Sequence, residues 1–435
     1  MKFLLVFAPL FICLNSAVAQ DNDPPLTLAE VERQALESSY SAKTIKSEIE
    51  AAQNRVEAQS SLLYPKLSLE GNYRYITEVP TLQFPGGPSI PFGDNQNYSI
   101  GPTLTWNLLD FGSIKNSTLS AEAFQSSKEA EGSYINRQTL LKARLAYFKI
   151  QLRIEQQRLV ADSLKLAESQ YRDIQNRKEV GSSNRIDLLA AHKEVLNLKL
   201  QSRQLQADLF SDLRDLFALI GRTDSSFTPS PKGIDPIQTS LVAFRKYEGV
   251  HLDAKSLGQH PLIKMHAASA ESLRLISKSI SANELPKLGL FLKTSIDYPN
   301  GPILENIHQN TVGLSLSMPL YEGGKTSYEA AEKRNLAIAS DHRREQAQID
   351  IYRDWQKAKD QLKGLRDKRT LHADSVKQSV DRARLVYGSY RAGKSSFLEV
   401  QTANLHALEA KVQATTNDVQ ILIQLAYLAS ISEEQ

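Results

Sequence analysis

The feature that most constrains the fold of this chain is that one pattern of residues occurs twice. The segment GPTLTWNLLDFG, from Gly101 to Gly112, has a counterpart in GLSLSMPLYEGG, from Gly313 to Gly324. The same offset is kept downstream, where VGSSNRIDLLAA from Val180 corresponds to AGKSSFLEVQTA from Ala392. A constant register over this distance indicates two copies of one structural unit, each with the order helix, strand, loop, strand, very long helix, turn, helix.

The repeat predicts four parts of the chain. A leader peptide occupies residues 1–19, the first copy residues 20–222, a linker rich in Ser, Pro and Gly residues 223–250, and the second copy residues 251–435. The leader prediction rests on Lys2, an apolar run to Leu14 and the small residues of Ala17-Val18-Ala19, which is typical of an exported protein.

The only cysteine, Cys13, falls inside this leader. The bulky residues Leu10-Phe11-Ile12 before it disfavour a lipoprotein cleavage site, and the mature chain is expected to have no thiol. After the leader no run of about 18 apolar residues remains, so any crossing of a membrane is expected to use strands.

Four segments alternate apolar and polar residues with the period of a β-strand. Each is about ten residues long with one apolar face, the length and pattern of a tilted membrane-spanning strand. The apolar positions are Leu67, Leu69, Tyr73 and Tyr75; Tyr98, Ile100, Leu104 and Trp106; Leu288, Leu290, Leu292, Ile296 and Tyr298; and Val312, Leu314, Leu316 and Met318.

A sheet in lipid must close on itself, and the smallest such barrels have about eight strands. Four strands cannot close a barrel alone, whereas three chains supply about twelve. The pattern therefore favours a shared, oligomeric barrel in contact with lipid. The alternative is a soluble sheet packed on a core, although long helices leave little compact core to pack against.

Two stretches, from Gly112 to about Val180 and from Gly324 to about Ala392, read as uninterrupted helix. Each has roughly 70 residues, or ~100 Å at the rise of an α-helix. A heptad pattern in the first predicts a coiled-coil seam. The seam consists of Leu145, Leu152, Leu159 and Leu166, with Leu141 and Phe148 at the alternate position.

The residues between strand and helix predict the point at which the chain leaves the bilayer. Pro319 removes a donor from the strand ladder, and Asp110 suits the positive end of the helix that follows. Glycine permits the change of direction at Gly112, Gly323 and Gly324.

Several classes of function are disfavoured by composition. The formal net charge of +3 is spread along a chain in which 23% of residues are charged, so no basic patch indicates a nucleic-acid partner. The eight histidines lack the spacing of metal ligands, and no glycine-rich phosphate loop follows a strand. We therefore expect no enzyme activity, no metal and no cofactor.

Together these residues resemble the TolC-like outer-membrane efflux channel family. The resemblance covers the mature chain through LTLAEVERQALESS from Leu26, YPKLSL and LPKLGL before the strands, WNLLDFG and PLYEGG after them, and the two glycine-plus-acid turns. It implies a mainly α fold with a membrane β-barrel: a trimer whose twelve-stranded barrel is continuous with a twelve-helix α-barrel. Such a protein is a passive duct, served by an inner-membrane transporter and a periplasmic adaptor protein, for drugs, metal ions or secreted proteins.

The far helix tips are expected to form the entrance. Gly181 and Gly393 permit tight turns there, and Asp187 and Glu399 follow them, so threefold symmetry would repeat each acid into a ring that holds cations. The resemblance implies that Glu399 lies at the entrance constriction, and that Asp187 and Tyr390 belong to a closing network. The alternative for each acid is a carboxylate that stabilises the first turn of its helix.

The turns also differ from the family pattern. The resemblance implies adaptor contacts at the turns Val180-Gly181-Ser182 and Ala392-Gly393-Lys394, where the family commonly has Val-Gly-Leu. Ser395 replaces a basic residue that often holds the gate in the family, so two alternatives stay open: a looser gate, or a gate that uses Arg391 or Lys394 nearby. The competing hypothesis for the whole protein is a soluble periplasmic coiled-coil scaffold.

Overall fold

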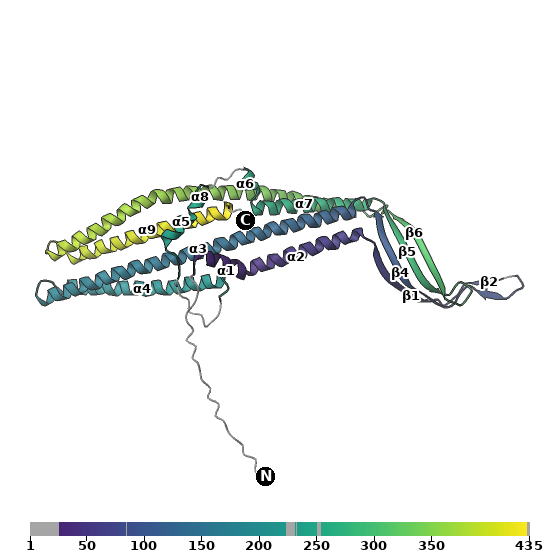
Figure 1. Cartoon of the computed structure of the whole chain (residues 1–435), viewed down its shortest axis with the longest axis horizontal. Helices are drawn as coiled ribbons and strands as arrows, with labels where there is room; N and C mark the ends of the chain where they lie inside the picture. Colours follow the sequence, from purple (N-terminus) through teal and green to yellow (C-terminus); the bar gives the residue numbers. More distant parts are fainter. Residues whose placement is uncertain (1–25, 84, 223–230, 232, 250–253, 433–435) are drawn as a thin grey trace, which may run out of the picture.

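A computed structural model describes residues 26–83, 85–222, 231, 233–249 and 254–432. The predicted leader, residues 1–19, lies outside the described residues, as does part of the predicted linker. The molecule is long and narrow, with helices along most of its length, a sheet at one end and a small hairpin beyond the sheet (Figure 1).

The order of helices and strands is the one that the duplication predicts. The first copy has α1 (Leu28–Ser38), α2 (Tyr40–Ser60), β1 (Lys66–Tyr75), β4 (Gln96–Leu109), α3 (Ser113–Glu179) and α4 (Arg185–Leu219); the second has α7 (Pro261–Ser281), β5 (Lys287–Tyr298), β6 (Ile307–Ser317), α8 (Lys325–Arg391) and α9 (Phe397–Ser432). Between them lie α5 (Ile237–Phe244) and α6 (Ala254–Gly258). The helices α3 and α8 each have 67 residues, which confirms the two uninterrupted helices.

The two junctions between sheet and helix have the same geometry. Gly112 and Gly324 precede α3 and α8 with φ of 82° and 80°, a left-handed conformation that favours glycine. The Asp110 carboxylate accepts hydrogen bonds from the Gly112 amide (3.0 Å) and the Ile114 amide (2.7 Å), so it satisfies free donors at the start of α3.

The four long strands form one antiparallel sheet in the order β1-β4-β5-β6. Their register confirms the predicted alternation, because Leu104 lies opposite both Leu67 and Leu292, and Leu292 lies opposite Val312. One side of the sheet, the apolar face, is made by these rows, and the other side is the polar face. The strands β1 and β6 are the two edges of the sheet.

Two loops lie at the outer end of the sheet. They end where β4 begins, at Gln96, and where β6 begins, at Ile307. The first loop also contains a hairpin of β2 (Thr81–Gln83) and β3 (Ser89–Pro91) that the sequence did not predict.

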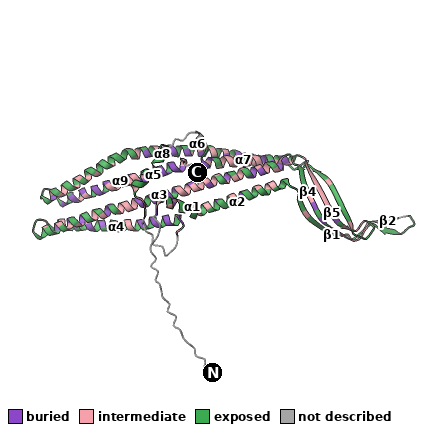
Figure 2. Cartoon of the chain, in the orientation of Figure 1, coloured by how far each residue is buried: buried purple, intermediate pink, exposed green. Residues whose placement is uncertain are grey.

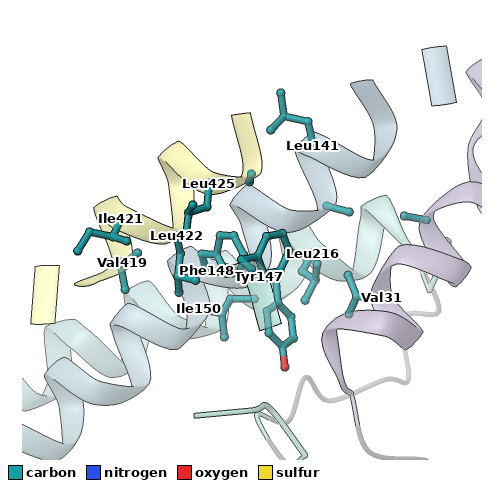
Figure 3. Close-up of a cluster of buried hydrophobic side chains, with 14 of the residues drawn as sticks. Val31, Leu141, Tyr147, Phe148, Ile150, Leu216, Val419, Ile421, Leu422 and Leu425 are labelled. Carbon is teal, nitrogen blue, oxygen red and sulfur yellow. The ribbon is translucent and has the colours of Figure 1, made fainter. Parts of the chain in front are cut away.

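The hydrophobic core lies midway along the helical part, where α3, α4 and α9 meet α1 (Figure 3). Tyr147 and Phe148 of α3 are fully buried there among residues such as Leu216 and Leu425. Buried residues continue in both directions along the helices (Figure 2).

The predicted coiled-coil seam is only partly correct. Leu141, Phe148 and Leu159 are buried, and Leu145 and Leu152 pack against the core. Leu166, by contrast, is 47% exposed, because a cavity separates the helix pairs at its level.

Close to the sheet, α3 and α7 pack through serines instead of leucines. Ser113, Ser120 and Ser127 recur every seventh residue on α3 and are buried. The Ser120 hydroxyl donates to the Ser272 carbonyl (2.8 Å), and the Ser272 hydroxyl donates to the Ser120 carbonyl (2.8 Å). Because these side chains are small and form hydrogen bonds with the backbone of the facing helix, α3 and α7 pack closely. We call Ser113, Ser120 and Ser127 the serine seam.

Candidate functional site

The helix tips are tight turns of the same form in both copies. Gly181 and Gly393 have φ of 75° and 72°. The amide of the next residue in each turn reaches back to the end of the preceding helix: Ser182 to the Arg177 carbonyl (2.7 Å) and Lys394 to the Ser389 carbonyl (2.9 Å). This is the Schellman pattern, in which a glycine ends the helix.

Each predicted gate acid lies in the first turn of its helix. The Asp187 amide donates to the Asn184 side chain (2.7 Å), which caps α4. At α9, the Glu399 amide donates to the Ser396 hydroxyl (3.4 Å) and the Glu399 carboxylate accepts from the Ser396 amide (3.3 Å). This reciprocal arrangement is a capping box, so Glu399 also stabilises the start of its helix.

The structure brings Asp187 and Tyr390 together, as the resemblance implied. The Tyr390 hydroxyl donates to the Asp187 carboxylate (3.1 Å) and lies 3.3 Å from the Ser183 hydroxyl. This contact joins α8 to the start of α4 and hence joins the two copies. Burial raises the pKa of Tyr390, which keeps the phenol protonated and able to donate at neutral pH.

A second bridge between the copies was missed by the sequence analysis. The Tyr387 hydroxyl donates to the Asp173 carboxylate of α3 (2.8 Å), and Arg177 donates to the same carboxylate (3.2 Å). Burial, followed by the Asp173 hydrogen bond, raises the pKa of Tyr387 to about 12. The spacing of Tyr387 and Tyr390 by three residues, on one face of a helix, was the available signal.

The basic group that joins the copies comes from α3. The Arg177 guanidinium donates to the Arg391 carbonyl (3.2 Å). The role of the Arg391 or Lys394 side chain at the gate stays a prediction. The Ser395 hydroxyl donates to the Val386 carbonyl (3.1 Å) in its own copy. Val180 is 75% exposed and Lys394 is also exposed, which leaves both turns open to a partner.

Apolar contacts support these polar bridges. Ile174, Ala191, Tyr390, Phe397 and Val400 form a buried cluster, and the Tyr390 and Phe397 rings are 5.5 Å apart. On the core side of this cluster lies a cavity of about 780 Å³ between the helix pairs. Its lining includes Leu166, Gln170, Glu194, Tyr387, Gln401 and Leu405.

Charges in the sheet are confined to one face. The four long strands contain six charged residues, and all six lie on the polar face: Lys66, Glu70 and Arg74 of β1 and Lys287, Lys293 and Asp297 of β5. The apolar face consists mainly of leucines, isoleucines and aromatic residues, and Leu314 on it is 66% exposed. One side of the sheet therefore suits lipid and the other suits water.

Within residues 26–432, leaving out the gaps given above, no three or more His, Cys, Asp or Glu side chains are grouped as metal ligands. None of the described helices is both long enough and apolar enough to cross a membrane.

Long paired helices, a sheet with one apolar and one polar face, and glycine turns at the far tips define an efflux channel of the outer membrane. The chain belongs to the outer membrane efflux protein family, whose model matches residues 31–222 and 254–432. It is accordingly an outer-membrane protein of an efflux class.

Individual relatives are distant in sequence and close in fold. The chain is 22% identical to the probable outer membrane lipoprotein SilC of Salmonella typhimurium over 409 residues, 92% of this chain and 82% of SilC. The structure of CusC has a TM-score of 0.78 at 16% identity, covering 93% of this chain and 91% of CusC. The outer membrane protein VceC of Vibrio cholerae has a TM-score of 0.77 at 15% identity, covering 93% and 96%.

Proposed function

We propose that three copies of this chain form a closed, twelve-stranded barrel in the outer membrane, continuous with a twelve-helix tunnel in the periplasm, and that the assembly is a passive export duct. The observation that carries this proposal is the separation of all six strand charges from the apolar face. Closure follows from the two edge strands, because an open edge in lipid would leave backbone groups without hydrogen bonds.

The proposal accounts for the apolar face better than the scaffold hypothesis does. A soluble sheet would need another layer over Leu67, Leu314 and Leu316, which are all more than half exposed. Lipid covers such a face without any further protein layer. The fold likeness to CusC, whose published description refers to transmembrane channel formation, is consistent with this reading.

Export through this duct would need energy from other proteins, because the duct supplies none. We propose that an inner-membrane transporter delivers the cargo, either small molecules such as drugs or secreted proteins. A periplasmic adaptor protein would contact the turns at Val180, Gly181, Gly393 and Lys394. The exposure of Val180 and Lys394 supports this contact.

We further propose the four-part division of the chain given above, with residues 1–19 as a cleaved leader and residues 223–250 as the linker between copies. The junction residues Asp110, Gly112, Pro319, Gly323 and Gly324 would mark the membrane exit. The equal length of α3 and α8 supports this division.

The helix tips would form the gate of the duct. In a trimer the bridge from Tyr390 to Asp187 would recur three times around the axis, and so would Glu399. Loss of one hydrogen bond to a charged group costs about 1.5–3 kcal/mol, so loss of three favours an open entrance.

The test is the conductance of the purified protein in a planar bilayer. Asp187→Asn with Glu399→Gln should raise basal conductance and weaken block by Mg²⁺, and Tyr390→Phe should raise conductance alone. Asp381→Asn, which changes a half-exposed acid on α8, the helix of Tyr390, is the control and should leave both quantities unchanged. Gate variants that behave like this control would remove these residues from the gate, and the absence of channels would contradict the proposed function.

A further inference from the structure

The six charges on the polar face of the sheet are not evenly distributed along the strands. The half of the polar face next to the helices contains Lys287, opposite Ser317, Lys66, opposite Thr105, and Lys293, opposite Thr103. We call these three lysines the lysine belt. Lys287 lies nearest the helix junction, Lys66 comes next, and Lys293 lies near the middle of the sheet.

The acids of the same face lie farther from the helices. Glu70 is opposite Gly101, and Asp297 is opposite Ser99. The remaining basic residue, Arg74, also lies in this outer half. Strand residues therefore place three positive charges and no negative charge in the helix-proximal half.

The ammonium groups of two belt lysines donate hydrogen bonds to neutral oxygens. The Lys293 ammonium donates to the Ser99 hydroxyl (3.2 Å), and the Lys287 ammonium donates to the Asn283 side chain (2.9 Å). Among the residues that the structure describes, no carboxylate forms an ion pair with a belt lysine. Hydrogen bonds to neutral oxygens orient a charge without cancelling it.

We propose that the lysine belt makes the membrane part of the duct favour anions, so that solutes bearing carboxylate, phosphate or sulfate groups pass in preference to cations. The inference rests on the proposed trimeric duct, in which nine belt lysines line the inner half of the barrel. Rings of Lys or Arg select anions in pores, and the low-dielectric wall of a barrel concentrates their field. The acids at the helix tips have the opposite sign, so the two ends of the duct would differ in ion preference.

The test is the reversal potential of single channels in a planar bilayer under a KCl gradient. Wild-type tips are kept in every variant, so that the contribution of the gate cancels. Lys66→Gln, Lys287→Gln and Lys293→Gln together should lower the Cl⁻ over K⁺ permeability ratio at least about twofold, and Lys293→Glu should lower it as a single change. The matched control changes three exposed lysines of the helices, Lys46, Lys363 and Lys368, to Gln and should leave the ratio unchanged.

Two failures can be told apart. Trimers that conduct, with the same permeability ratio in the belt variant as in the wild type, would overturn this inference and leave the proposed duct intact. Wild-type protein that never forms a conducting trimer would contradict the proposed function itself. All belt substitutions place a polar residue on the polar face, so each variant is expected to assemble. The mass of the trimer in detergent is measured first for each variant, and its currents are recorded afterwards.

Discussion

At the helix tips, single side chains join the two copies. Two phenols of one helix face, Tyr387 and Tyr390, reach carboxylates of the other copy, Asp173 and Asp187. Because the pKa of each phenol is raised, both phenols stay protonated and able to donate over the whole physiological pH range. The tips are therefore expected to respond to a partner or to cations before they respond to a change of pH.

A residue far from the tips is expected to respond to acid instead. His260 caps α7 by accepting a hydrogen bond from the Leu262 amide (3.3 Å), and burial together with the charge of Arg137 lowers its pKa to about 4. The unfolded chain binds this proton more tightly, so the stability contributed by His260 is present above pH 6.5 and is lost as pH falls toward 4. The loss can reach roughly 3 kcal/mol per chain.

The measurement for this residue is the thermal midpoint at pH 7 and at pH 4.5. His260→Asn keeps a good capping residue but cannot titrate in this range. The midpoint should therefore drop less between the two pH values in the variant than in the wild type. Equal drops in the two proteins would show that His260 does not couple to folding.

The residue scale also shows what the sequence could predict. The pair Asp187 and Tyr390 was found because both positions fit a family pattern. The second bridge, from Tyr387 to Asp173 and Arg177, was not found, because its members lie on different helices and their distance depends on how the two copies pack. Sequence periodicity describes one helix at a time and does not give that packing.

Among the elements, the sheet offers the sharpest contrast between neighbouring residues. Leu314 and Ser315 are adjacent on β6 and lie on opposite faces, with Leu314 on the apolar face. Leu314→Arg should cost ~2–4 kcal/mol at mid-membrane and block assembly, whereas Ser315→Arg should be tolerated on the polar side. The readout is the amount of trimer in purified outer membranes, and equal amounts for the two variants would mean that the apolar face does not contact lipid.

The serine seam predicts a different kind of sensitivity. Ser120 is buried against Ser272, so Ser120→Leu overpacks the contact of α3 with α7 and should cost about 1–3 kcal/mol. Ser126→Leu is the control, since Ser126 is exposed on the same helix. The thermal midpoint should fall for Ser120→Leu only, and a fall of the same size for both would contradict close packing at the seam.

Elements were predicted well where a pattern was local. The sequence showed the alternation of the four strands. It also showed the length of α3 and α8, which contain no proline and few glycines. The serine seam repeats every seven residues, like the leucines farther along α3, but serine is also common on solvated faces and gave no clear signal. The exposure of Leu166 was missed because the cavity beside it is created by four helices together.

At the scale of the whole molecule, two copies of one unit make a chain that is incomplete by itself. In the described part of the chain the sheet has two unpaired edges and an apolar face without a protein layer, and the largest buried core lies around the middle of the helices. The sequence indicated this incompleteness through the number of its strands. Closure by further copies is the simplest arrangement that satisfies both edges and both faces at once.

The most direct test of this account is the detergent-corrected mass, by light scattering, of the mature protein extracted from outer membranes. The account predicts the mass of three chains. A monomer recovered from the soluble periplasm would contradict it, because four strands alone cannot close a barrel, and the scaffold hypothesis would then replace the export duct.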